Sequence, residues 1–193
     1  MELELVIAPD ERLDTAVTKE WDFDNPQYDA NELRDSMIGV MRQNRGIGLS
    51  ANQVGIMDAR CFVFQNNQAN NDYERNVLAL HPSYEIVEDV PEIDMWEGCL
   101  SFPGITLQIK RPSRIKAKWK GVDGKDYSDE LFGYQARCFM HEMDHLEGIL
   151  FIDYLSKLKK SMIVKKLSKQ KKELEIHSTL AKPFTQFVLY ELF

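Results

Sequence analysis

A helical pattern that carries two histidines is the feature that most constrains the fold of this chain. From about Asp129 to Glu147 the apolar residues recur with helical spacing, and Gly148 is a natural stop. His141 and His145 share one face of this helix, and Glu142 lies about 100° round the helix from His141. The apolar residues place this helix in a core; they are Leu131, Phe132, Cys138, Phe139, Met143 and Leu146. Buried imidazoles need polar partners, which the rest of the chain must supply.

Alternating apolar and polar residues predict antiparallel strands in the middle of the chain. Residues 105–112 and 114–121 both alternate in this way, and Asp123–Gly124 is a turn signal that closes a hairpin. Shorter strands are expected at residues 59–65 and in the segments NVLALHP and YEIVED. The Asn-rich segment 66–72 is expected to be an exposed loop.

Two further helices are expected, one before and one after the strands. Residues 31–45 carry an apolar stripe, with Asn31 as the N-cap and Gly46 as the stop. Residues 155–175 carry only a thin apolar stripe, together with eight lysines between Lys157 and Lys172. The sequence therefore predicts an α+β fold, with antiparallel sheets packed around the central metal-binding helix and a C-terminal helix.

Composition limits the class of protein. A chain of 193 residues with 44% hydrophobic residues is long enough to bury one sizeable core. Its net charge of −7 argues against a protein that coats DNA or membranes. Three scattered cysteines do not suit a disulfide framework, and neither a signal peptide nor an apolar run of the roughly 18 residues that span a bilayer is visible. We therefore expect a soluble, cytoplasmic protein with no DNA or membrane partner.

The two histidines have the spacing of a pair of metal ligands on one helix, and the glutamate between them is placed to act as a general base. Catalytic zinc-type sites use three protein ligands and keep one position open, so a third ligand is needed. In the metzincin pattern a histidine follows Gly148 by three residues, but Phe151 stands there. A thermolysin-like site needs a glutamate from a later helix. Glu173 and Glu175 are available, although solvated surface charge is the commoner explanation in a Lys-dense segment.

Two cysteines compete for the third position. Cys138 precedes His141 by three residues, so it shares one narrow stripe with both histidines, and three ligands in a row cannot surround a metal. Cys99 lies in a turn-like step between strands, from which a thiolate can reach the helix. A small buried apolar residue is the usual role of a free cysteine, and that alternative remains for Cys99.

Three ordered segments resemble the signature motifs of the peptide deformylase family. They are Gly46-Ile47-Gly48-Leu49-Ser50-Ala51-Asn52-Gln53, Glu97-Gly98-Cys99-Leu100-Ser101 and His141-Glu142-Met143-Asp144-His145-Leu146-Glu147-Gly148. The similarity begins at Ala8-Pro9-Asp10-Glu11-Arg12-Leu13 and ends at Phe151-Ile152-Asp153-Tyr154-Leu155, so it covers most of the chain. We expect residues 1–175 to form one deformylase-like catalytic domain that includes the Lys-rich helix, and residues 176–193 to form an apolar C-terminal extension.

The resemblance implies a metal-dependent hydrolase that removes the formyl group from N-formylmethionyl nascent peptides and releases formate. The implied metal ligands are Cys99, His141 and His145. Fe²⁺ is the expected native metal, with Zn²⁺, Ni²⁺ or Co²⁺ as replacements. Glu142 would take the proton from a metal-activated water as it attacks the formyl carbon, and would return it to the leaving amine. The side-chain amide of Gln53 and the backbone N–H of Leu100 would stabilise the oxyanion.

The resemblance also implies a pocket for an extended peptide with a methionine side chain. Its expected substrate-binding residues are Ile47, Gly48, Glu97, Gly98, Tyr134, Arg137 and Cys138. Arg137 stands where the family usually has an aliphatic residue, so either its guanidinium swings to the pocket rim or methionine specificity is altered. Ser50 replaces the commoner Ala, and Thr106 replaces a substrate-contacting Arg of some members. Arg111 is expected either to pair with Glu97 and brace the Cys99 turn or to face solvent.

Two alternative functions and one further partner follow from the same residues. The helical HExxH pattern alone also suits an endopeptidase, and the fold without catalysis suits a module that binds nascent chains or a structural metal. The chain keeps the base Glu142, the three implied metal ligands and Gln53, which argues against a module without catalytic activity. The Lys157–Lys172 segment is a hypothetical contact with ribosomal RNA, although such a run is more often a solvated face.

Overall fold

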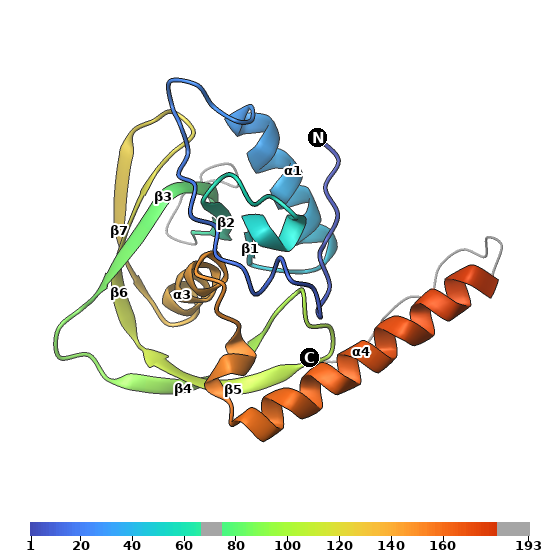
Figure 1. The fold of residues 1–193 in the computed structure, drawn as a ribbon. Helices are drawn as coiled ribbons and strands as arrows, with labels where there is room; N and C mark the ends of the chain where they lie inside the picture. Colours follow the sequence, from blue (N-terminus) through green and yellow to red (C-terminus); the bar gives the residue numbers. More distant parts are fainter. Residues whose placement is uncertain (67–74, 181–193) are drawn as a thin grey trace.

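Two antiparallel sheets enclose one central helix in the computed structural model, which describes residues 1–66 and 75–180 (Figure 1). The larger sheet has the order β1-β2-β3-β6-β7, and the smaller one pairs β4 with β5. The central helix, α3 (Tyr134–Leu146), carries both histidines. The predicted α+β arrangement of antiparallel sheets around this helix is confirmed. The strands are β1 Gly48–Ser50, β2 Cys61–Gln65, β3 Asn76–Ile86, β4 Glu92–Gly98, β5 Thr106–Pro112, β6 Arg114–Lys120 and β7 Asp126–Phe132.

The first helix, α1 (Ala30–Gln43), begins and ends earlier than its sequence pattern suggests. The side chain of Asp29 accepts a hydrogen bond from the backbone N–H of Glu32, so Asp29 caps the helix and the prediction of Asn31 as the cap is wrong. The helix ends before Arg45, which has a φ of 58°, so Gly46 is not its stop. Its apolar stripe packs on the larger sheet.

Strand β3 joins two segments that the sequence pattern separates. The pairing of β3 with β6 shifts in register between Leu80 and Ser83, where His81 has a φ of 48°. One continuous strand with a bulge therefore replaces the two predicted short strands. Residues 106–112 form β5, which pairs with β4 rather than with the hairpin of β6 and β7. Of the Asn-rich loop predicted at 66–72, residues 67–72 lie outside the described part of the chain.

The start of the central helix is the main error of the sequence prediction. Residues 129–132 belong to β7, whose Leu131 pairs with Ile115 of β6 and is fully buried. The helix begins only after Gly133, which has a φ of 58°. Leu131 and Phe132 are adjacent, so they extend the apolar pattern of the following helix and show no strand period. The glycine turn and the pairing with β6 place them in a strand.

The core lies between α3 and the larger sheet. Phe139 of α3 meets Phe62 and Phe64 of β2 edge-to-face, with ring centroids 4.9 Å and 5.4 Å apart. A second cluster packs on the other side, where Phe102 meets Phe151. Because α3 is covered from both sides, its polar residues face an interior, and their positions are fixed by packing.

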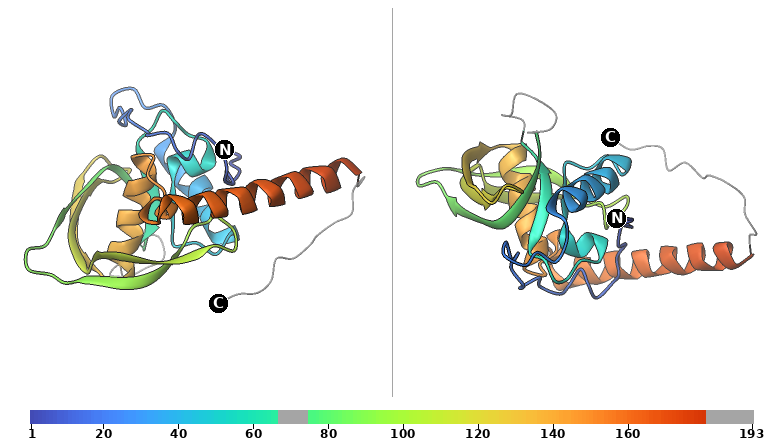
Figure 2. Two further views of the ribbon diagram at one scale, coloured as in Figure 1. Left: turned by 60° about the horizontal axis from the view of Figure 1, so that its bottom comes forward. Right: turned by 90° about the horizontal axis from the view of Figure 1, so that it is seen from above.

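The last helix, α4 (Lys157–Leu180), runs out from the body of the molecule (Figure 2). The helix was expected at 155–175, and residues 151–154 before it form a short 3-10 turn, η2. Leu167 is buried against the second core cluster, and most lysines of α4 are exposed. No helix among residues 1–66 and 75–180 has both the length and the apolar character that crossing a bilayer requires. Most of the predicted apolar extension, residues 181–193, lies outside the described residues.

Candidate metal centre and active site

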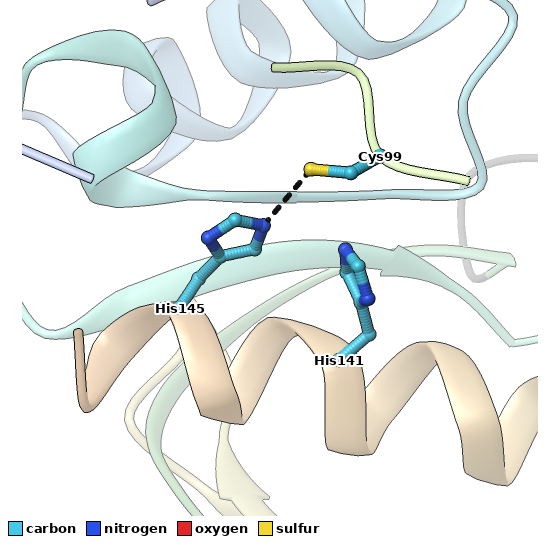
Figure 3. Close-up of side chains that lie close together, drawn as sticks. All are labelled: Cys99, His141 and His145. Carbon is cyan, nitrogen blue, oxygen red and sulfur yellow. Dashed lines mark hydrogen bonds between the residues drawn. The ribbon is translucent and has the colours of Figure 1, made fainter. Parts of the chain in front are cut away.

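Cys99, His141 and His145 come together from two elements (Figure 3). Their candidate ligand atoms all lie within 4.8 Å of one another, and all three side chains are buried. The histidines project from successive turns of α3, and Cys99 approaches from the turn that follows β4. The Sγ atom of Cys99 lies 3.2 Å from Nε2 of His145. Among the described residues, this is the one group of three or more potential ligands that could hold a metal ion.

A buried carboxylate orients His141. Oε2 of Glu97 lies 3.2 Å from Nδ1 of His141, which leaves Nε2 of that ring for the centre. Arg111 binds Glu97 through two nitrogens, at 2.6 Å and 3.0 Å, and reaches Asp144 at 2.8 Å. The pairing of Arg111 with Glu97 is therefore confirmed, and the solvent-facing alternative for Arg111 is wrong. Carboxylate partners of this kind fix the orientation of a metal-binding imidazole.

The guanidinium of Arg137 does not reach the pocket rim. It is buried, contacts Glu97, and donates to the carbonyls of Ile109 and Ile93 at 2.7 Å and 2.8 Å. Of the two alternatives left open for Arg137, the rim placement of its guanidinium is therefore wrong. A buried arginine needs a counter-charge and acceptors, and Glu97 with the two strand carbonyls provides them, whereas the rim provides only water. Arg137 thus ties α3 to the smaller sheet.

The electrostatics of the site suit a bound cation. Burial opposes a charged His141, yet contacts with Cys99 and Glu97 raise the pKa of His141 well above its ordinary value. Burial lowers the pKa of His145 well below its ordinary value, which keeps that ring neutral. A metal ligand must be a neutral imidazole, so a bound cation would displace the proton that the contacts with Cys99 and Glu97 favour on His141. One thiolate and two imidazoles are a donor set for zinc or for a redox-capable divalent metal. The residues present therefore fit the metal that the sequence predicts.

Glu142 lies on the same helix, between the histidines, with its carboxylate held in the interior. Burial raises the pKa of Glu142 to about 7. The hydroxyl of Ser50 lies 2.7 Å from Oε2 of Glu142 and 2.9 Å from the Glu142 carbonyl. A buried carboxylate with a pKa near neutrality is well suited to exchange protons at physiological pH.

The Gln53 amide is oriented by its own turn. Oε1 of Gln53 accepts a hydrogen bond from the backbone N–H of Ser50 at 2.8 Å, so Nε2 is turned toward the metal centre. Nε2 lies 3.4 Å from the sulfur of Cys99 and 3.1 Å from the hydroxyl of Ser101. A fixed N–H donor beside the centre has the position that oxyanion stabilisation requires.

These groups border an open pocket of about 810 Å³. All the sequence-predicted site residues except His145 line it, including Leu100. Ile47 and Tyr134 lie at its exposed edge. The sequence interpretation missed Trp96, which is 61% exposed beside the pocket. Ile93, Asp94 and Met95 begin an alternating pattern that the adjacent apolar Trp96 breaks, so the signal for the strand that presents it is weak.

Gly48 allows Glu142 and Cys138 to approach the chain closely. A Cβ atom at residue 48 would lie 2.4 Å from Oε1 of Glu142 and 2.6 Å from Sγ of Cys138. We expect Gly48→Ala to lower kcat at least about tenfold, because the carboxylate must move away from the centre. Gly39→Ala is the matched control, since nothing lies within 4 Å of a Cβ there. Steady-state release of formate, the product that the family resemblance implies, measures kcat for both variants. An unchanged kcat in Gly48→Ala would contradict the close approach.

The charge network around Glu97 gives a pH dependence of folding stability. Burial alone would raise the pKa of Glu97, but hydrogen bonds from His141 and Arg111 lower it from 4.5 to about 2. A depressed carboxyl pKa stabilises the fold above pH 4.5, by about 3 kcal/mol, and this contribution is lost as the pH falls toward 2. Urea unfolding of metal-free protein between pH 6 and 2 measures it.

Two variants test that assignment. Glu97→Gln is expected to flatten the fall in unfolding free energy between pH 4.5 and 2, because the titrating group is gone. Glu130→Gln, which removes the exposed partner of Arg114, is the matched control and should leave the slope as in wild type. Equal slopes in wild type and Glu97→Gln would rule out Glu97 as the source.

Comparison with known proteins identifies the family. The family described as "Polypeptide deformylase" matches residues 2–161 of this chain. The peptide deformylase of Wolbachia pipientis wMel is 37% identical over 179 residues, which cover 90% of this chain and 98% of that protein. The chain belongs to the peptide deformylase family. The peptide deformylase of Zymomonas mobilis is a second relative, 39% identical over 173 residues, with 88% of this chain and 95% of that protein covered.

Solved peptide deformylases have the same fold. A structure from Legionella pneumophila superposes with a TM-score of 0.76 at 30% identity, and covers 91% of this chain and 98% of that one. A structure from Ehrlichia chaffeensis in complex with actinonin gives a TM-score of 0.72 at 31% identity, over 88% and 97% of the two chains. This peptide deformylase is thus an enzyme of a metal-dependent family, and Cys99, His141 and His145 form its potential metal site.

Proposed function

We propose that this deformylase hydrolyses the formyl amide of N-formylmethionyl peptides, with Glu142 as general base and then general acid. One observation carries the proposal: Glu142 and Gln53 line the same pocket as Cys99 and His141 of the candidate metal cluster. A base, a cation site and an oxyanion donor around one cavity are the parts that amide hydrolysis by water requires.

Cys99, His141 and His145 would hold one divalent metal, with Fe²⁺ as the native ion and Zn²⁺, Ni²⁺ or Co²⁺ as possible replacements. When bound, the metal supplies Lewis-acid activation of water and of the carbonyl group. The thiolate supports iron as well as zinc, since soft ligands suit both. Glu97, braced by Arg111 and Arg137, would keep His141 oriented toward the ion.

The protein's own groups would carry the proton and the developing charge. Glu142 would accept the proton of the attacking water and deliver it to the amine that leaves, so that formate and a free N-terminus result. Nε2 of Gln53 and the backbone N–H of Leu100 would donate to the oxygen that becomes negative. Because the pKa of Glu142 lies at about 7, both its charged and its neutral forms are accessible near neutral pH.

The peptide would lie along the pocket between Gly46–Gly48 and the end of β4. Ile47, Tyr134 and Cys138 offer apolar and sulfur contacts for the methionine side chain. Glu97 and Gly98 form the opposite edge. Arg137 contributes its hydrocarbon stem to the wall, because its guanidinium nitrogens Nη1 and Nη2 are occupied by Glu97 and strand carbonyls. On this account methionine specificity is retained despite the arginine.

Product analysis tests the proposed reaction. Protein purified without oxygen and assayed for bound metal is expected to release stoichiometric formate from a formyl-Met peptide and to leave internal peptide bonds intact. Cleavage of internal bonds without formate would favour the endopeptidase. The absence of both products from metal-loaded protein would favour the catalytically silent module.

The lysines of α4 support a ribosomal contact in the cytoplasm, where nascent formylated chains emerge. The segment Lys157–Lys172 contains eight lysines and no acidic residue, and most of its lysines are exposed. Such a helix is attracted to RNA phosphates and releases counterions on binding. We place residues 1–175 in one catalytic domain that includes this helix.

Ribosome binding is therefore expected to weaken steeply as salt rises. Combining Lys165→Glu, Lys166→Glu and Lys169→Glu on the exposed face should lower ribosome affinity at least about tenfold, since each change removes a cation and adds an anion. Co-sedimentation with ribosomes at several salt concentrations measures it. Lys116→Glu on β6 is the control, and salt-insensitive binding or equal loss with the control would contradict the contact.

A further inference from the structure

Ser50 connects the proposed base to the strand that borders the pocket. It is the last residue of β1, its side chain is fully buried, and it lies 92 positions before Glu142 in the sequence. Its hydroxyl lies 2.7 Å from Oε2 of Glu142, a distance typical of a hydrogen bond from a hydroxyl to a carboxylate. The family resemblance puts Ala at this position in most members, so the hydroxyl is a feature of this chain.

The two oxygens of the Glu142 carboxylate have different surroundings. Oε2 faces the Ser50 hydroxyl, whereas Oε1 lies against Gly48, where a Cβ would come within 2.4 Å of it. The carboxylate is therefore held at Oε2 by a hydrogen bond, while Oε1 lies beside Gly48, where the lack of a side chain leaves room for it. Fixing one oxygen defines the rotamer of the side chain and leaves the other available to a reacting proton.

Ser50 also fixes the second polar group of the pocket. Its backbone N–H donates to Oε1 of Gln53 at 2.8 Å, which turns Nε2 of that amide toward Cys99. One residue thus orients the base through its side chain and the oxyanion donor through its main chain. The side-chain contact can be removed by mutation while the main-chain contact remains.

We propose that Ser50 is a positioning residue for this reaction, in which its hydroxyl holds Glu142 by Oε2 in the geometry that proton transfer requires. The inference rests on the proposed role of Glu142. A purely structural role is the competing account, because the hydroxyl also lies 2.9 Å from the Glu142 carbonyl and a single proton serves one acceptor at a time. In that account the hydroxyl ties β1 to α3 and does not act on the carboxylate.

Ser50→Ala separates the two accounts in the metal-loaded enzyme. We expect kcat to fall roughly tenfold, because a hydrogen bond to a charged group is lost, while KM stays within about twofold and bound metal per chain is unchanged. Ser50→Cys has a side chain of similar size that donates only weak hydrogen bonds, so it should give an intermediate decrease in kcat. This variant replaces Ser50→Ala in the comparison if the alanine variant folds poorly. Ser36→Ala, which removes an exposed hydroxyl bonded to the Met1 carbonyl, is the control with unchanged kcat.

A double-mutant cycle supplies the decisive measurement. In the Glu142→Ala background, Ser50→Ala should change the residual rate by less than about twofold, because the group it acts on is absent. The unfolding free energies of wild type, the two single variants and the double variant should show coupling between the side chains of Ser50 and Glu142. A hydrogen bond from Ser50 to the Glu142 backbone carbonyl alone would give no such coupling.

Specific outcomes overturn the inference. An unchanged kcat in Ser50→Ala, a loss of bound metal that accounts for the whole decrease, or an equal loss in both backgrounds would each contradict it. If Glu142→Ala is inactive while Ser50→Ala matches wild type, only the role of Ser50 fails. If Glu142→Ala keeps wild-type kcat, the proposed mechanism itself fails.

Discussion

Replacing Cys99 with Ala is expected to lower metal affinity by more than about 100-fold. Loss of a residue that only hydrogen-bonds to a metal ligand costs up to about 100-fold in affinity, and loss of a ligand itself should cost more. Cys99 is the only one of the three proposed ligands that does not lie on α3, and His141 and His145 alone would provide two ligands from one helix. Formate release should fall with the bound metal. Metal analysis of protein purified without oxygen, followed by titration with Zn²⁺ or Ni²⁺, measures the change.

Cys138→Ala is the matched control for that prediction. Cys138 lies on the same helix as the histidines, and burial raises its pKa well above the ordinary value, so it stays a thiol. The variant is expected to keep wild-type metal content. If Cys138→Ala lost the metal and Cys99→Ala kept it, the assignment of the third ligand would be reversed. Equal losses would instead indicate that both sulfur atoms are needed to form the site.

The second large effect is expected for Glu142→Gln, which should lower kcat by about 10² to 10⁴-fold while bound metal is unchanged. The amide has nearly the shape of the carboxylate but cannot accept the proton of the attacking water. Stopped assays of formate release with metal-loaded protein measure kcat. A variant that kept both its metal and its wild-type kcat would exclude Glu142 as the base.

The pH profile gives an independent check on the same residue. Burial raises the pKa of Glu142 to about 7, and a bound cation lowers the pKa of a neighbouring carboxyl group, so the acid limb of wild-type kcat/KM should lie at or below pH 7. The rate should rise with pH through that value because the charged form is the base. The limb should disappear in Glu142→Gln. Glu147→Gln, on the exposed end of the same motif, is the control that should keep it.

Local patterns were enough for several parts of this protein. The helix face shared by His141 and His145 follows from the helical period, which operates within a few residues, and the strands β5 and β6 follow from strict alternation. Phe151 excluded the metzincin arrangement without any structure. Helical spacing argued against Cys138, because three ligands on one narrow stripe cannot surround a metal, and the order of three family motifs supported Cys99.

Other features depend on contacts between segments that are distant in the sequence, and only the tertiary structure decided them. Residues 129–132 extend the helical apolar pattern that follows them, but their pairing with β6 makes them a strand. The sequence left open whether the guanidinium of Arg137 reaches the pocket rim. A buried guanidinium is stable only where a carboxylate and carbonyl groups meet it, and Glu97 with two strands provides those partners.

The candidate metal site shows most clearly which features follow from local sequence and which from tertiary structure. The sequence by itself determined that two imidazoles and a carboxylate share one helix, because that geometry is local. The tertiary structure brought Cys99 to His145 across 46 positions and Ser50 to Glu142 across 92. Chain separations of that size carry no periodic signal, since packing of whole elements rather than backbone propensity sets those distances.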